Sequence, residues 1–527
     1  MFFLIVGLSA CAEPGVVEIA DFRLRLRPVV PGNEAPFEAL DHIDLLVQPE
    51  AGEAVRTSFE VLSSGATPVA EGIPALENAV IYVEGYVGDD LTAWGRTEAL
   101  TASTGEIDAA VLVAETDRAA WFGPLTDPVM GGLLVALGEG RFFFGGGVNE
   151  GTGTTLEQSL DTTAVLSLAP PEDTLAFADS GTLPTYLDSY DGDELRARYG
   201  ATLTPITLGN DAGRFLLVGG GGGPGYTRGA DLTRDVQVFD AVAGTWTLAR
   251  ESDQLEIARS DHLAIGNAQG AVVVAGGWTV AAPDAYAVTQ TIEVWDPATG
   301  GFAPAQAAPE LGSLDLVGAD LGVDGTLICG GAFFDDGEWF STNHCVEVGL
   351  DGAVDDGPDL PAALTASAMI TLPDGRILLT GGVTQGSRFG LEEEPAPAAR
   401  ADAWVYVGNG TWQAVSRMAL PRAGHRMAVL PDGRVLVAGG APTYSPVRVP
   451  QEAYACLEIF DPTTNTFTLV DDCTGDDAAV GLAGRAYKPS IAVDSEFGAL
   501  VVGGANANGT GEFASSQVTL YTPEHAP

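Results

Sequence analysis

The sequence is poor in basic residues, and this scarcity argues against one large class of partners. Among 527 residues, 24 are lysine or arginine against 72 aspartate or glutamate, which gives a net charge of -48 at pH 7. Lys488 is the only lysine. So acidic a surface repels phosphate backbones, and we expect no nucleic-acid binding. The acidic residues are scattered, which favours a solvated, salt-tolerant surface over a surface built for cations.

Motifs for metal, phosphate and nucleophilic chemistry are also missing. The acidic cluster Asp188, Asp191, Asp193 and Glu194 lacks calcium-loop spacing and is interpreted as a solvated linker. The glycine run at 219–225 precedes no helical pattern, so it predicts a loop rather than a phosphate site. No G-x-S-x-G elbow occurs. We therefore predict no catalytic, cofactor or metal residue.

Two of the five histidines occupy matching positions in the chain. His262 in ARSDHLAI and His425 in PRAGHRMAV each stand just before an expected buried strand. Repetition at an equivalent position favours a structural role, such as bonding between repeats, over a unique catalytic one.

An apolar run at 2–10, FFLIVGLSA, ends at Cys11 and is too short to cross a bilayer as a helix. The sequence LSAC at 8–11 resembles the lipobox of bacterial lipoproteins. This resemblance implies a signal peptide over 1–11, a lipid on Cys11 and an outer-membrane anchor, facing either the periplasm or the cell surface. No lysine or arginine precedes the run, unlike the usual signal. The alternative is an ordinary cysteine ending an apolar segment.

The other four cysteines form two local pairs. Cys329 and Cys345 flank one expected hairpin, and Cys456 and Cys473 flank another. Opposed residues of an antiparallel pair lie close enough for a disulfide, so we predict Cys329–Cys345 and Cys456–Cys473. Both suit the oxidising compartment that a lipoprotein signal implies. A metal site is the weaker alternative, supported only by His344 beside Cys345.

An apolar stretch running into a glycine pair recurs seven times, at intervals of roughly 50 to 75 residues, in the segments 141–147, 214–220, 271–277, 326–331, 376–382, 434–440 and 499–504. Continuous apolar runs of this length are typical of strands buried on both faces. Tight-turn signatures such as FDPTTNTF follow several of them.

This pattern resembles kelch repeats, most clearly at 422–440, and the resemblance covers roughly 400 residues. It implies an all-β fold with a kelch-type β-propeller over 116–527, of seven blades or, as runner-up, six. The last repeat stops one strand short, so we expect 119–125 to supply that strand and close the ring.

Residues 17–115 have no glycine pairs but several short alternating strands separated by Gly, Pro and Asp. This pattern predicts a small β-sandwich of immunoglobulin-like or related type.

For function, we expect a lipid-anchored, monomeric cell-envelope protein that binds a protein or glycan partner through propeller loops, without catalysis. The alternative is an extracellular carbohydrate-active hydrolase, lyase or copper oxidase with its site at the channel mouth. Kelch-like galactose and glyoxal oxidases hold copper with a Tyr–Cys crosslink, for which no free cysteine is expected here. Three or more titratable groups meeting at the channel mouth would favour the enzyme.

Overall fold

The computed structural model describes the residues 17–19, 22–29, 36, 39–60, 76–102, 105–122, 125, 129–149, 158–168, 177–187, 194–195, 197–222, 232–250, 253–282, 285–384, 396–444, 450, 452–470, 486–505 and 514–524. Within these ranges the regular structure is β-strand, apart from one 3-10 turn, η2 (Gly322–Asp324). The all-β prediction is confirmed. None of the ranges contains a helix long and apolar enough to cross a membrane.

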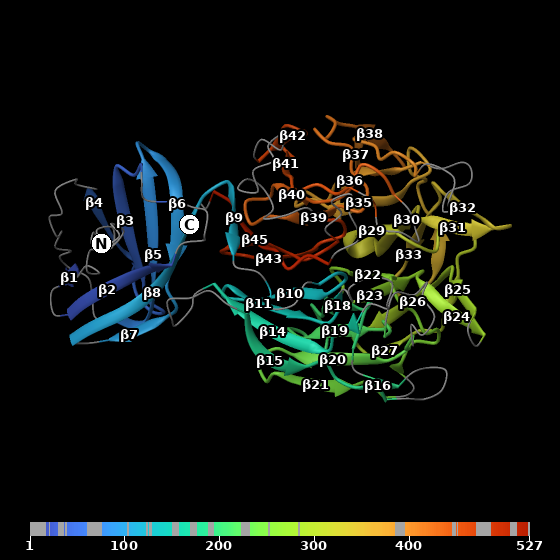
Figure 1. The fold of residues 1–527 in the computed structure, drawn as a ribbon, viewed down its shortest axis with the longest axis horizontal. Coiled ribbons are helices and arrows are strands. Elements are labelled where there is room, and N and C mark those ends of the chain that lie inside the picture. Colours follow the sequence, from blue (N-terminus) through green and yellow to red (C-terminus); the bar gives the residue numbers. More distant parts are fainter. Residues whose placement is uncertain are drawn as a thin grey trace.

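The N-terminal part forms one eight-stranded sheet beside the rest of the chain (Figure 1). Its path runs β1-β2-β8-β6-β5-β3-β4, with β7 paired to β5 and with β2 parallel to β8. Its strands are β1 (Val17–Ile19), β2 (Phe22–Val29), β3 (His42–Gln48), β4 (Val55–Glu60), β5 (Leu76–Val87), β6 (Asp90–Arg96), β7 (Leu100–Ala102) and β8 (Gly105–Glu115).

The short strands expected in this part are present, and hydrogen bonds join them into one sheet through the long strand β5. Its first residues pair with β7, while the rest pairs with β3 on one side and β6 on the other. Strand β5 is therefore hydrogen-bonded to three strands, β7, β3 and β6, and holds them in one sheet.

Within the described part of the chain, seven further sheets of four or five strands follow, and the strands of each are given from the innermost outward. They comprise β10 (Leu133–Gly138), β11 (Arg141–Gly145), β14 (Thr162–Ser167), β15 (Phe177–Thr182); β18 (Thr202–Pro205), β19 (Phe215–Val218), β20 (Val236–Asp240), β21 (Thr245–Leu248); β22 (Leu263–Gly266), β23 (Val272–Ala275), β26 (Thr291–Asp296), β27 (Gly301–Phe302) with β28 (Gln306–Ala307); β29 (Val317–Asp320), β30 (Thr326–Cys329), β33 (Cys345–Val348), β34 (Val354–Asp356); β35 (Thr365–Thr371), β36 (Ile377–Val383), β37 (Ala403–Tyr406), β38 (Trp412–Ala414); β39 (Arg426–Val429), β40 (Val435–Ala438), β41 (Leu457–Asp461), β42 (Thr466–Leu469); and β43 (Ser490–Asp494), β44 (Gly498–Val502), β45 (Val518–Thr522), β9 (Arg118–Phe122).

Small two-stranded sheets project from the connections of these larger sheets. They are β12 (Val148–Asn149) with β13 (Gln158–Ser159), β16 (Tyr186–Leu187) with β17 (Glu194–Leu195), β24 (Trp278–Ala282) with β25 (Ala285–Val288), and β31 (Ala332–Asp335) with β32 (Glu338–Ser341).

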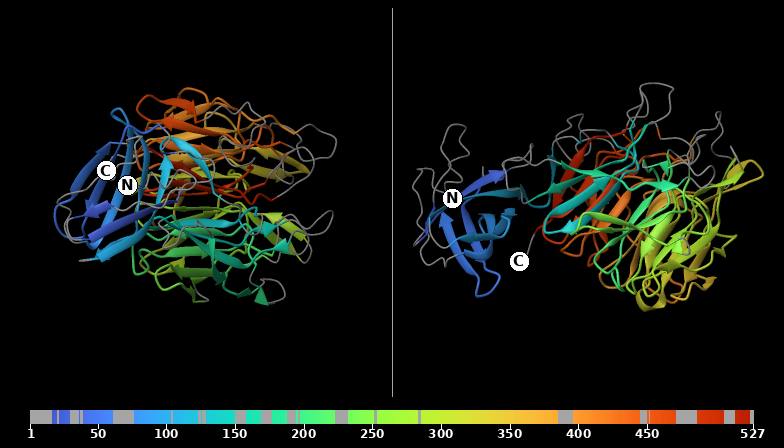
Figure 2. Two further views of the ribbon diagram at one scale, coloured as in Figure 1. Left: turned by 60° about the vertical axis from the view of Figure 1, so that its left-hand side comes forward. Right: turned by 90° about the horizontal axis from the view of Figure 1, so that it is seen from below.

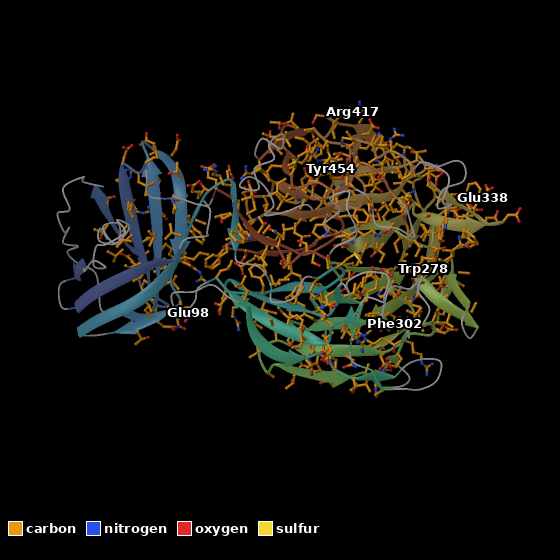
Figure 3. The ribbon with its side chains drawn as sticks, viewed as in Figure 1. Glu98, Trp278, Phe302, Glu338, Arg417 and Tyr454 are labelled. Carbon is orange, nitrogen blue, oxygen red and sulfur yellow. A yellow bond between two sulfur atoms is a disulfide. The ribbon has the colours of Figure 1, made fainter. Side chains whose placement is uncertain are left out.

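The innermost strands surround one axis. Each contacts the next in a closed cycle, β10, β18, β22, β29, β35, β39, β43 and back to β10 (Figure 1). Side chains fill the spaces between neighbouring sheets (Figure 3). We call this assembly the ring.

The second strand of each sheet carries the repeated apolar run. Strands such as β23 and β40 are buried at every residue, because a neighbouring sheet covers each face. The glycine pair that ends each apolar run adopts positive φ, as at Gly276 and Gly277 (φ 66° and 100°). A Cβ on Gly276 would lie 2.3 Å from the carbonyl oxygen of Ser313 in the next repeat. Glycine is therefore needed where the chain leaves one sheet and touches the next.

The ring closes through a strand from far upstream in the sequence. Strand β9 overlaps the expected segment 119–125 and begins one residue before it; it pairs antiparallel with β45 and completes the last sheet. Arg434 of the preceding sheet strengthens the junction by pairing with Asp117 at 2.5 Å. The expected closure is confirmed.

The disulfide between Cys329 and Cys345 joins directly opposed residues of β30 and β33. Since these two sulfurs bond each other, they are not metal ligands beside His344. Cys456, next to β41, is also disulfide-bonded. Cys473, Cys11 and the acidic residues Asp188, Asp191 and Asp193 lie outside the described residues.

Candidate functional site

One backbone position recurs at the entrance to every innermost strand of the ring. Seven residues there have φ between 50° and 67°, the left-handed region: Gly131, Gly200, Asp261, Asp315, Ala366, Gly424 and Lys488. Glycine adopts this conformation without strain, whereas other residues pay for it. Three of the seven are charged residues, and strained positions of this kind concentrate at functional sites.

At two of these positions, a tyrosine ring of the next repeat leaves no room for a side chain, which explains why the residue is glycine. Tyr487 lies over Gly424 of the preceding repeat, where a Cβ would come within 2.3 Å of its ring. Tyr199 covers Gly131 in the same way, at 2.6 Å. These aromatic contacts fix how successive repeats approach each other around the axis.

A cavity of about 570 Å³ lies on the axis of the ring and is lined by the innermost strands of all seven sheets. Its ionisable lining residues are Asp261, His262, Asp315, His425, Arg426, Tyr199, Tyr487 and Lys488. Groups from different repeats thus meet in one space. We call this space the axial cavity.

Asp315 is the centre of a buried polar cluster in the wall of the axial cavity. Lys488 Nζ lies 2.6 Å from Asp315 Oδ1, and the Tyr444 hydroxyl donates a hydrogen bond of 2.5 Å to Asp315 Oδ2. Tyr444 follows β40 and is fully buried in an apolar cluster that includes Trp278 (labelled in Figure 3). Three repeats therefore contribute one group each to this cluster.

The environment sets the protonation of these groups. Burial alone would raise the pKa of Asp315, but the charge and hydrogen bond of Lys488 bring it below its ordinary value. Burial works against the Lys488 ammonium, yet the Asp315 carboxylate outweighs it and raises the pKa of Lys488. Burial and the Asp315 charge raise the pKa of Tyr444 well above 10. At neutral pH the cluster is an ion pair with a neutral phenol.

Tyr487, next to Lys488 in the chain, differs from Tyr444. Its hydroxyl is buried and has no hydrogen-bond partner among the described residues, and the same holds for the Ser367 hydroxyl. Burial raises the pKa of Tyr487 to about 12, so its hydroxyl keeps its proton. Both residues line the axial cavity. Their hydroxyls can serve a bound molecule without breaking a described contact.

The two repeated histidines link neighbouring sheets, as expected. His262 Nε2 lies 2.9 Å from the Thr202 hydroxyl of the preceding sheet, and His425 Nε2 lies 2.7 Å from the Thr380 hydroxyl. Burial lowers the pKa of each imidazole to about 3, helped by the charge of a nearby arginine. Both rings are therefore neutral at pH 7.

Buried arginines form a second repeated contact, in addition to the histidines. Arg198, Arg259 and Arg422 each stand two residues before the left-handed position. Each donates a hydrogen bond to the backbone carbonyl of the first glycine in the pair of its own sheet. Two of them also pair with a buried glutamate, Arg259–Glu293 at 2.6 Å and Arg422–Glu458 at 2.9 Å. The sequence signal that could have predicted this contact is an arginine at matching places in the repeats, as in ARSDH and PRAGH.

Among the three members of the Asp315 cluster, only Lys488 stands out in the sequence, as the single lysine. Asp315 and Tyr444 lie 173 and 44 positions from it. Cys329 and Cys345 lie in the sheet of β30, where they hold two strands together. The histidines border the axial cavity in their structural role.

The described residues do not fit a copper centre. No group of three or more His, Cys, Asp or Glu side chains could hold a metal ion within the described ranges. The disulfide-bonded Cys329, Cys345 and Cys456 offer no thiol for a crosslink to tyrosine. His262 and His425 each bond a threonine instead.

Comparison with known proteins identifies the fold rather than a family. No protein-family model and no curated protein match the chain. Solved structures do match. A novel fungal alcohol oxidase of the AA5 family, in complex with copper, is 15% identical, with 77% of this chain and 76% of that chain covered and a TM-score of 0.54. The structure of YjhT is 14% identical, with 66% of this chain and 99% of that chain covered and a TM-score of 0.42.

Proposed function

We propose that the ring is a seven-bladed kelch-type β-propeller of a bacterial lipoprotein anchored through Cys11, and that the axial cavity is a carbohydrate-active site. The seven-sheet ring closed by β9 and the recurring glycine pairs support the propeller. The LSAC sequence at 8–11 supports the anchor. A fold shared with the fungal alcohol oxidase supports the architecture and carries no activity with it.

The observation that carries the enzymatic proposal is the meeting of acid and base groups in one cavity. The pKa of Asp315 is lowered and that of Tyr487 is raised, so one is a carboxylate and the other a phenol at pH 7. A carboxylate and a protonated phenol are the states that a base and a proton donor need. Asp315 fits the role of base or charge stabiliser, and Tyr487 that of proton donor to a sugar oxygen. Hydrolysis and elimination both use such a pair.

Binding without catalysis is the second candidate, and one observation favours it. Lys488 and Tyr444 each occupy one oxygen of the Asp315 carboxylate. A carboxylate whose two oxygens already accept hydrogen bonds is a weak base. In that case the role of the cluster is to stabilise the wall of a binding pocket. The copper-oxidase version of the enzyme is not part of the proposal, because the described residues do not fit the metal.

A turnover assay separates these candidates. The purified protein is incubated with a panel of polysaccharides, and new reducing ends and new carbon–carbon double bonds are measured. We expect Tyr487→Phe, which removes a hydroxyl with no described partner, to lower the rate by about 100-fold or more. Asp315→Asn should have a similar effect. Asp296→Asn, at the end of β26 and outside the cavity lining, is the matched control and should keep the rate.

Two outcomes contradict the enzymatic proposal. Glycan binding without any product would assign the cavity to recognition alone. Turnover that survives both Tyr487→Phe and Asp315→Asn would place the chemistry elsewhere.

A further inference from the structure

The charge of the axial cavity differs from that of the whole protein. The chain carries a net charge of -48, yet its single lysine lies in this cavity. The charged residues described in the lining are Asp261, Asp315, Arg426 and Lys488, two of each sign. Both lining histidines are neutral at pH 7, as shown above. The acidic surface therefore gives way to a lining without net charge.

Arg426 is the cation in this lining that no acid neutralises. It opens strand β39, is exposed, and lines the axial cavity. No ion pair among the described residues includes it, whereas Arg259 and Arg422 each have a glutamate at hydrogen-bond distance. Its charge lowers the pKa of Asp315 and of His425, so it acts on the cluster in the cavity wall.

From this placement we infer that the axial cavity selects a carbohydrate carrying an anionic group, a carboxylate or a sulfate, and that Arg426 binds that group. This inference rests on the proposed function and names its substrate class. A guanidinium offers two parallel N–H donors that match an anionic group with two oxygens. The buried hydroxyls of Tyr487 and Ser367 have no partner among the described residues, so turning them toward a sugar oxygen breaks no described hydrogen bond.

Selectivity follows from the cost of covering a charge. A neutral sugar that fills the cavity removes water from Arg426 and gives it no opposite charge, which opposes binding. An anionic sugar replaces the lost water with a charge-assisted hydrogen bond. Because the protein is strongly acidic elsewhere, added salt weakens both the attraction to Arg426 and the long-range repulsion of the ligand.

The test compares oligosaccharides of equal length by isothermal titration calorimetry: an oligogalacturonate, its methyl ester, a sulfated dextran oligomer and the unsulfated dextran oligomer. We expect at least about tenfold tighter binding of one anionic oligomer than of its neutral counterpart. The two anionic arms distinguish a carboxylate ligand from a sulfate ligand. Arg426→Gln should remove the preference, and Arg426→Lys should retain only part of it.

Arg250→Gln serves as the matched control, because Arg250 is an exposed arginine that pairs with Asp253 and is not among the residues that line the cavity. It should leave the preference unchanged, and thermal unfolding checks that both variants fold. Equal binding of anionic and neutral oligomers, or an unchanged preference in Arg426→Gln, would overturn the inference. Anion-selective binding without product would contradict the enzyme alone, whereas turnover of neutral glycans only would contradict this inference alone.

Discussion

The indole of Trp94 packs edge-on against the phenyl ring of Phe497, with ring centroids 5.4 Å apart. Trp94 lies in β6 of the N-terminal sheet, and Phe497 precedes β44 of the ring. Arg96 adds an ion pair to Glu496 at 2.7 Å and stacks over the Phe497 ring. These side-chain contacts join the N-terminal sheet to the ring, in addition to the chain that leads to β9. Figure 2 shows the N-terminal sheet beside the ring.

Removing this contact should loosen the N-terminal sheet from the ring. Phe497→Ala leaves a cavity against Trp94, which is 1% exposed, and we expect a loss of about 3–5 kcal/mol in the free energy of unfolding. Urea denaturation followed by tryptophan fluorescence measures it. The control is Phe334→Ala, since Phe334 is 53% exposed and its truncation should cost little. Similar losses in the two variants would contradict this role.

The buried pair Arg422–Glu458 should be costly to break from one side. Arg422→Met leaves an uncompensated carboxylate at a fully buried position, which we expect to cost about 3–5 kcal/mol. The double variant R422M/E458M should recover only part of the lost free energy of unfolding, because Glu458 also accepts hydrogen bonds from the backbone of Ala419 and Leu420. A double-mutant cycle in urea measures the coupling. A loss below about 1 kcal/mol in the single variant would argue against the pair.

The pKa of His425, about 3, predicts a specific pH dependence of stability. Burial keeps the folded imidazole neutral, while the unfolded chain takes up a proton below its ordinary pKa of 6.5. This contribution to stability is therefore present at neutral pH and is lost as the pH falls from 6.5 towards 3.

His425→Gln removes the titrating group and retains an amide for Thr380. The stability of the wild type relative to this variant should fall by about 1–2 kcal/mol between neutral pH and about pH 5. Urea titrations at the two pH values measure the difference. A difference independent of pH would mean that folding does not perturb the imidazole.

The predictable part of the fold came from patterns that act locally. The apolar runs before each glycine pair mark strands such as β40, because a strand covered on both faces needs apolar residues at every position. The missing outer strand of the last sheet pointed to β9, because an open sheet leaves unpaired backbone groups. Cys329 and Cys345 face each other across one pair of strands, so their spacing sufficed.

The N-terminal sheet was less predictable. The alternating pattern predicted that these segments are β-strands. It did not predict that β5 pairs with β3, β6 and β7, because strand pairing depends on contacts between distant parts of the chain. The alternation of apolar and polar residues specifies which face of a strand is buried, but it does not specify which strands lie beside it.

Composition and contacts between near neighbours are enough to specify an acidic, all-β chain with seven repeated apolar strands and a local disulfide. The site depends on contacts between residues that are distant in the chain. Tyr444 lies 129 positions from Asp315, and Lys488 lies 173 positions from it. They meet because ring closure places the entrance of every innermost strand around one axis, whatever the sequence distance between the repeats.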